Sequence, residues 1–222
     1  AGGKIASFMH LKGVGKGSGF FLAIAMIFLA QPLINLLTVW NAGMSLPESM
    51  QGLENSMRTM EDQATEMTEL FLNVNSIGAL LFNILLLAII PALGEEFVFR
   101  GILQKQLQRW TKSGWAAILI SAFIFSAFHM QFYGFVPRFI LGILLGYVFL
   151  RSGKLWLSIL IHFINNGMAV IMYYLYHNNY IAENPDELFN FNDNIPVLLI
   201  SFLLLGGSII LFHLVYKKQS HE

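Results

Sequence analysis

Two adjacent carboxylates and an arginine follow directly after a long apolar run. Glu95, Glu96 and Arg100 stand in GEEFVFRG, which comes after SIGALLFNILLLAIIPAL. Ionised groups at such a position are costly in a membrane and commonly functional. Residues four apart share a helix face, so Glu96 and Arg100 can form an ion pair, while Glu95 points about 100° away. Glu95 is then left to face an interior cavity, where it could act as a general base.

Two later apolar segments also carry polar side chains. His129 ends FSAFH and shares a helix face with Phe125, and His162 begins HFINN and shares a face with Asn166. Asn165 is expected to point elsewhere. Each position also has a structural interpretation. Glu95, Glu96 and Arg100 could be charges that reach the interface from a helix end. His129 could be a hydrogen-bonded packing residue, and His162 with Asn166 could be an amide–imidazole pair that holds helices together.

Taken together, these groups on three spans predict hydrolysis inside the membrane. Glu95 and His129 could hold a water molecule and remove its proton. His162 and Asn166 could then donate hydrogen bonds to the oxyanion that forms when this water attacks an amide carbonyl. Since polar groups in membrane spans normally face the bundle interior, the pattern points to peptide-bond cleavage in a water-filled cavity.

The composition places the chain among integral membrane proteins. Of its 222 residues, 56% are hydrophobic and only 12% are charged, and a soluble domain cannot bury that much apolar surface. The formal net charge is zero, so there is no nucleic-acid-binding signature. The absence of cysteine excludes disulfides, a thiolate nucleophile and thiolate metal ligands.

Six apolar segments predict an all-α bundle of about six transmembrane helices, forming a single domain over residues 1–222. A spanning helix needs about 20 mostly apolar residues, and the third and fourth segments are shorter. Most basic residues fall on one side of the alternating loops, so the positive-inside rule places both termini in the cytoplasm. Residues 1–19 predict a cytoplasmic tail before a retained first span, not a signal peptide. The segments are Phe20–Trp40, Ile77–Leu93, Trp115–His129, Phe139–Leu150, Leu155–Tyr176 and Ile195–Tyr216.

The expected depths of the two histidines demand a bundle of irregular geometry. Counting about 1.5 Å per residue from the cytoplasmic side puts His129 about 25 Å deep and His162 about 10 Å deep. Straight, upright helices would keep them apart, so the third span must tilt or begin outside the bilayer. Pro91 and Pro137 are the expected bends.

Residues 46–72 predict an amphipathic helix on the extracytoplasmic side. Apolar residues recur there at steps of three and four, opposite an acidic face. The helix either lies at the bilayer interface or on neighbouring spans, or serves as a lid or a docking surface for a protein partner. The apolar stripe consists of Leu46, Met50, Leu53, Met57, Met60, Ala64, Met67 and Phe71.

The three polar motifs resemble those of one protein family. EEFVFR is similar to an EExxxR motif, FSAFH to FxxxH and HFINN to HxxxN, in the same order and on successive spans. They resemble the CPBP family, which includes CAAX prenyl proteases of the Ras-converting type and bacteriocin-processing or self-immunity proteins. The resemblance covers residues 77–176, the expected catalytic core.

This resemblance implies an all-helical intramembrane endopeptidase whose active site is reached from the cytoplasmic side. It implies that Glu95 is the general base, that His129 positions the water, and that His162 and Asn166 form the oxyanion hole. The supporting motif positions would be those of Glu96, Arg100 and Phe125. The expected substrate is a membrane-associated protein or peptide, and the expected location is a bacterial inner membrane.

The chemistry of the site leaves alternatives open. A metal-free glutamate mechanism is expected because no HExxH motif occurs, with Zn²⁺ held by Glu95, His129 and His162 as the alternative. The same three residues could form the proton relay of a transporter, although no paired repeats are visible. A non-catalytic scaffold could instead bind a membrane partner through the Met-rich helix at 46–72.

Overall fold

The computed structural model describes residues 17–185 and 194–217, and within these ranges every regular element is helical. The predicted tail therefore lies almost entirely outside the described residues. The elements are α2 (Gly17–Ala42), η1 (Glu48–Met50), α3 (Gln51–Leu72), α4 (Ile77–Asn83), η2 (Ile84–Ile89), α5 (Ile90–Glu96), η3 (Phe97–Gln104), α6 (Lys105–Thr111), α7 (Gly114–Phe128), α8 (Phe135–Ser152), α9 (Leu155–His177) and α10 (Ile195–Lys217).

The predicted all-α membrane bundle is confirmed, and the chain is an integral membrane protein. Five helices of the described residues are long and apolar enough to cross a bilayer: Gly17–Ala42, Ile77–Thr111, Phe135–Ser152, Leu155–His177 and Ile195–Lys217. The third predicted span is different, because α7 has only 15 residues. At about 1.5 Å per residue it is shorter than the roughly 30 Å hydrocarbon core.

The second predicted span does not end at Leu93. The elements from α4 to α6 form one continuous apolar helix of 35 residues, Ile77–Thr111. Two of its segments, η2 and η3, are π-helical, and Ile90 N–H accordingly donates to the carbonyl five residues back, on Leu85. The helix continues past Glu95, Glu96 and Arg100 because Glu96 and Arg100 find partners inside the protein, so no helix end occurs at these charges.

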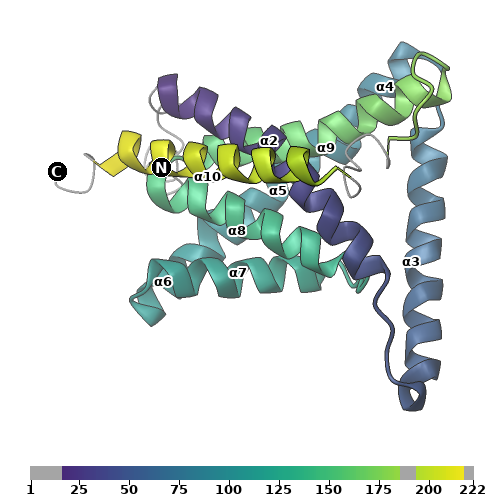
Figure 1. Ribbon diagram of the computed structural model, residues 1–222, viewed down its shortest axis with the longest axis horizontal. Coiled ribbons are helices and arrows are strands. Elements are labelled where there is room, and N and C mark those ends of the chain that lie inside the picture. Colours follow the sequence, from purple (N-terminus) through teal and green to yellow (C-terminus); the bar gives the residue numbers. More distant parts are fainter. Residues whose placement is uncertain (1–16, 186–193, 218–222) are drawn as a thin grey trace, which may run out of the picture.

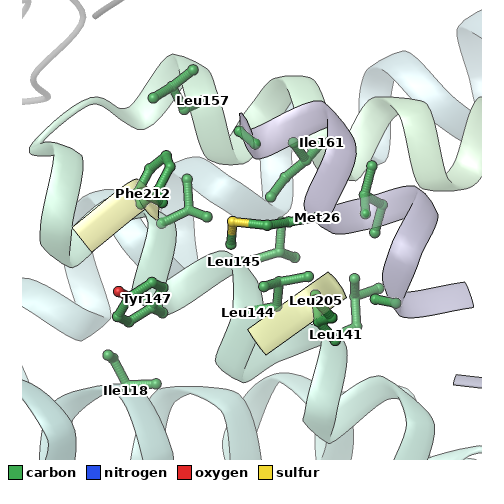
Figure 2. Close-up of a cluster of buried hydrophobic side chains, with 14 of the residues drawn as sticks. Met26, Ile118, Leu141, Leu144, Leu145, Tyr147, Leu157, Ile161, Leu205 and Phe212 are labelled. Carbon is green, nitrogen blue, oxygen red and sulfur yellow. The ribbon is translucent and has the colours of Figure 1, made fainter. Parts of the chain in front are cut away.

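The hydrophobic core gathers around α8. Figure 2 shows Leu144, Leu145 and Tyr147 of α8 in one cluster with Met26 of α2 and Phe212 of α10. Ile118 of α7 and the α9 residues Leu157 and Ile161 close the same cluster. The polar motifs on the neighbouring helices are thereby fixed against one central helix.

Two glycines one turn apart on α8 allow this close packing. A Cβ atom built on Gly142 would lie 3.0 Å from Ala122 Cβ and 3.2 Å from Ala122 Cα. One built on Gly146 would lie 2.9 Å from Gln104 Oε1. Small residues at such spacing let membrane helices approach closely, as here between α7 and α8 and between η3 and α8.

Gly142→Ala is expected to lower the free energy of unfolding by about 1–3 kcal/mol, because the new methyl group meets backbone that cannot move aside. Reversible unfolding in mixed micelles would measure the change. Gly206→Ala in α10 is the matched control, since nothing lies within 4 Å of its Cβ position. Equal stability of the two variants would contradict the packing argument.

The helix predicted at 46–72 exists and runs across the end of the bundle, transverse to α7 and α10 (Figure 1). It begins at Gln51, after the short turn η1, and not at residue 46. Much of its apolar stripe is exposed: Met50, Leu53, Met60, Met67 and Phe71 are between 39% and 59% accessible.

A polar clamp fixes α3 to the loop between α7 and α8. Glu54 accepts hydrogen bonds from the Leu46 N–H (2.8 Å) and from Arg58 (2.8 and 3.0 Å). The Arg58 guanidinium lies 4.1 Å from the centre of the Tyr133 ring. Glu61 accepts a hydrogen bond from the Tyr133 N–H at 2.9 Å.

The clamp is expected to weaken in acid. The hydrogen bond from the Leu46 backbone, followed by those from Arg58, holds the pKa of Glu54 below its ordinary value of 4.5. A carboxyl group whose pKa is lower in the folded state than in the unfolded state stabilises the fold when it is ionised. This stability is fully present above pH 4.5 and is lost as the pH falls through the lowered pKa of the folded state. The difference in Tm between the wild type and Glu54→Gln should therefore shrink in that acid range. A Tm difference that stays constant over this pH range would contradict a contribution from the ionised Glu54 carboxylate.

Candidate active site

The predicted ion pair between Glu96 and Arg100 is present and buried. Arg100 donates to Glu96 Oε1 at 2.8 Å, and the two side chains are 1% and 0% exposed. Arg100 also donates to the Gly142 carbonyl at 2.9 Å, and its guanidinium lies 4.7 Å from the centre of the Phe125 ring. One turn further along, Gln104 donates to the Gly146 carbonyl at 3.0 Å. These contacts fix the rotation of the long helix against α8.

His162 lies between the two glutamates. Its Nδ1 is 2.9 Å from Glu96 Oε1, and its Nε2 is 3.7 Å from Glu95 Oε2. Because the ionised Glu96 can only accept hydrogen bonds, the Nδ1 atom of His162 carries a proton. The Nε2 atom is therefore the one presented to Glu95.

The two glutamates differ in accessibility. The Glu95 side chain is 28% exposed, whereas Glu96 is fully enclosed. The consecutive positions thus give one carboxylate held by protein groups and one that a water molecule or a substrate can reach. This agrees with the division of roles expected from helical spacing.

Phe125 connects the two predicted histidines. Its ring centroid lies 5.1 Å from that of His129 and 6.0 Å from that of His162, in both cases edge to face. His129 Nδ1 is 2.8 Å from the Phe125 carbonyl, so this nitrogen donates and Nε2 is left as an acceptor. Two residues expected at different depths therefore meet around one ring, as the site requires.

Asn166 faces the same long helix from α9. Its Nδ2 lies 3.4 Å from the carbonyl of Leu87 in η2. Pro91, four residues after Leu87, has no N–H with which to satisfy that carbonyl in an α-helix. Asn166 thus has a structural partner as well as its predicted place in the site.

Asn165 points toward α2 and not toward the long helix that Asn166 faces, as predicted, but its partner Gln31 was missed. Gln31 of α2 donates to Asn165 Oδ1 at 3.1 Å, and Asn165 donates to Asn166 Oδ1 at 3.2 Å. This chain of amides orients Asn166 so that its NH₂ group points away from Asn165. The available signal was a buried glutamine inside an otherwise apolar span, beside Pro32.

Two grooves flank these residues. An apolar groove of about 300 Å³ between α5 and α9 is lined by Ala92, Leu93 and Phe163, which adjoin the glutamates and His162 in sequence. A second groove, of about 380 Å³, lies between α2 and α9 and includes Gln31 and Asn165 in its wall. Both grooves are therefore lined by helices that also carry residues of the candidate site.

The donor atoms do not form a ready metal site. In the described parts of the chain, no three or more His, Asp or Glu residues are grouped so as to hold a metal ion. Glu95 and His162 adjoin, and His129 and His162 both contact the Phe125 ring. The three side chains are thus neighbours, but they are not grouped as the ligand set of a zinc ion.

The comparisons with known proteins agree with the motifs. Residues 77–168 match the family model described as type II CAAX prenyl endopeptidase Rce1-like, and every predicted site residue lies within that segment. An uncharacterized 24.3 kDa protein of Escherichia coli is 32% identical over 100 residues, which is 43% of this chain and 46% of that relative. The chain thus matches about half the length of this curated relative, and no solved structure matches it significantly. The resemblance drawn from the three motifs is confirmed by this match, which places the similarity to the type II CAAX prenyl endopeptidase Rce1-like family at residues 77–168.

Proposed function

We propose that the chain is an intramembrane endopeptidase that cleaves a membrane-associated protein or peptide, with Glu95 as the general base. The observation that carries the proposal is the accessible Glu95 carboxylate, 3.7 Å from Nε2 of the buried His162 inside the Rce1-like segment. A water molecule bound to Glu95 would lose a proton to it while its oxygen attacks the scissile carbonyl carbon. His129 helps to position this water through Nε2.

The oxyanion of the tetrahedral intermediate is stabilised by Asn166 and His162. Asn166 donates from its NH₂ group, whose direction is fixed by the Gln31–Asn165 chain. His162 donates from Nε2 once the proton taken by Glu95 has moved across the 3.7 Å gap between the two side chains. When the intermediate collapses, the carbon–nitrogen bond breaks and this proton passes to the leaving amine. Donors fixed in place before the reaction, as the Asn166 amide is here, are the main source of such stabilisation.

Glu96, Arg100 and Phe125 support these groups from behind. Glu96 fixes the tautomer of His162, and Arg100 neutralises Glu96 at 2.8 Å. Phe125 contacts both imidazoles and lies against the guanidinium. None of the three needs to contact the substrate.

The mechanism needs no metal ion. Incubation of the purified protein with EDTA or 1,10-phenanthroline is expected to leave the cleavage rate unchanged, because a carboxylate removes the proton from water in this mechanism. Metal analysis of the same preparation by mass spectrometry gives the independent readout. Loss of activity on chelation, restored by one equivalent of Zn²⁺, would contradict the metal-free mechanism.

Comparative proteomics of new N- and C-termini in membranes would test the function. Cells with the wild-type chain are compared with cells carrying Glu95→Gln at equal expression. Peptide ends present only with the wild type would establish the protease and name its substrate and cleaved bond. Identical ends, with a deletion phenotype that the variant still rescues, would contradict the proposal and favour a scaffold.

The proposed location is the inner membrane of a bacterium, with both termini and the opening of the site on the cytoplasmic side. The Escherichia coli relative and the distribution of basic residues support it. The exposed stripe of α3 then lies on the opposite side of the membrane.

A further inference from the structure

A third groove of the bundle lies apart from the candidate active site. It has a volume of about 390 Å³ and is formed by α2, α8 and α10, with Trp115 at the start of α7. Its wall is almost entirely apolar, and Phe202 at its edge is 60% exposed. Since α2, α8 and α10 are all candidate membrane spans, this groove opens within the hydrocarbon region. The side chains of α8 and α10 that line it include Ile140, Ile143, Leu144, Tyr147, Leu205, Ile209 and His213.

One end of the groove is basic. His213 lines it, and Arg151 lies beside His213 with the guanidinium Nη2 3.0 Å from His213 Nε2. An arginine can only donate, so His213 Nε2 accepts and its Nδ1 carries the proton. Lys217 follows one helical turn later on α10 and adds a second basic side chain to this end.

The Arg151 charge lacks an anion within the described residues. No carboxylate of those residues lies within ion-pair distance of it, and its Nε is buried without a hydrogen-bond partner. Arg100, which is buried against α8, has Glu96 beside it at 2.8 Å. A guanidinium at the end of a membrane span is stabilised when an anion reaches it, because the surrounding medium is poor at solvating charge.

The rim of the groove has the composition of a membrane interface. Trp115 stacks on Tyr147 at a centroid distance of 5.9 Å, and both line the groove close to its basic end. Trp and Tyr are enriched at the level of the lipid headgroups, and basic side chains lie on the cytoplasmic side of that level. The apolar and basic parts of this site therefore follow the order of an acyl chain and a headgroup.

We propose that this groove binds an anionic phospholipid, with one acyl chain between α8 and α10 and the phosphate on Arg151 and the Nδ1–H of His213. Basic pockets between membrane helices recognise anionic headgroups in this way. A zwitterionic lipid offers the same chain but brings its own cation to a site that already has two. A soluble phosphate would satisfy Arg151 but would leave the apolar wall without an occupant. The site is independent of the proposed catalytic chemistry.

Native mass spectrometry of the full chain in detergent would test the proposal. Phosphatidylglycerol and phosphatidylcholine with identical acyl chains are added in equal amounts, and the lipid retained on the protein is counted. The wild type is expected to retain phosphatidylglycerol severalfold more than phosphatidylcholine. The double variant Arg151→Gln/His213→Gln should lose this preference, whereas Arg109→Gln, an exposed charge predicted on the same side of the membrane, should keep it.

A second pair of variants tests the apolar wall of the groove. Ile209→Trp fills the groove and is expected to reduce retention of phosphatidylglycerol, while Ile210→Trp, on the neighbouring exposed position, is not. Glycerol 3-phosphate is expected not to compete. Equal retention of both lipids by the wild type, unchanged retention by the double variant or Ile209→Trp, or effective competition by glycerol 3-phosphate would each overturn the proposal. The melting temperature of every variant confirms that the folded protein is being compared.

Discussion

Glu95→Gln is expected to reduce the rate of peptide cleavage about 10²- to 10⁴-fold, the usual contribution of a general base. The amide keeps the size and the hydrogen-bonding capacity of the carboxylate but cannot take a proton from water. Because the Glu95 side chain is 28% exposed and lies 3.7 Å from its partner His162 Nε2, a longer separation than in the buried pair of Glu96 and Arg100, the variant should retain the melting temperature of the wild type. The loss should appear in kcat, with KM little changed, since Glu95 acts on water and not on substrate binding.

The substrate identified by the comparison of termini, reconstituted with the purified protein in liposomes, provides the assay. Glu66→Gln, an exposed carboxylate on α3, is the matched control and should cleave at the wild-type rate. A Glu95→Gln protein that cleaves as fast as the wild type would eliminate Glu95 as the base. A variant that is inactive and also unfolded would instead assign Glu95 a structural role.

Arg100→Gln is expected to destabilise the protein by about 3–5 kcal/mol, the cost of leaving one member of a buried ion pair without its partner. Glu96 would keep only His162 at 2.9 Å, and the Gly142 carbonyl would lose its donor at 2.9 Å. The glutamine is too short to replace both contacts from the same helix position. Unfolding in mixed micelles, followed by far-UV circular dichroism, would measure the difference.

Two further variants separate charge from packing. Arg109→Gln removes an exposed arginine two turns along the same helix and should have little effect. The double variant Glu96→Gln/Arg100→Gln leaves no isolated buried charge and should recover part of the loss. If Arg100→Gln were as stable as Arg109→Gln, the ion pair of Glu96 and Arg100 would not be needed for the stability of the site.

The helical spacing of Glu96 and Arg100 was sufficient to predict their ion pair, because that contact lies within one helix. The apolar segments likewise predicted the helices of the bundle. The end of the second span was misplaced at Leu93, since charges were expected to mark the exit from the membrane. The prediction could not include the acceptor on Gly142 and the His162 ring, which come from other helices.

The amide chain illustrates the same limit. The direction of Asn165 was inferred from its own helix, where it differs by about 100° from Asn166. Its partner Gln31 comes from α2, which lies outside the segment that matches the Rce1-like family. Contacts between distant spans depend on how the helices cross, and neither hydropathy nor periodicity reports that. The family match covers the three motifs but not Gln31, which orients Asn165 and through it Asn166.

The π-helical turns η2 and η3 let the long helix hold extra residues without turning the site away from its partners. Each such turn holds about one residue more than an α-helical turn, yet both kinds of turn complete one full rotation. A chain lacking a single residue between Ile84 and Ile89 could therefore close that turn as an α-helix. The side chains beyond the deletion would keep their direction relative to the preceding part of the helix, which Asn166 holds through Leu87. Homologous chains that are one residue shorter in η2 are thus expected to keep Glu95 and Glu96 facing His162, whereas the same deletion in the α-helical segment α5 would rotate both carboxylates by about 100°.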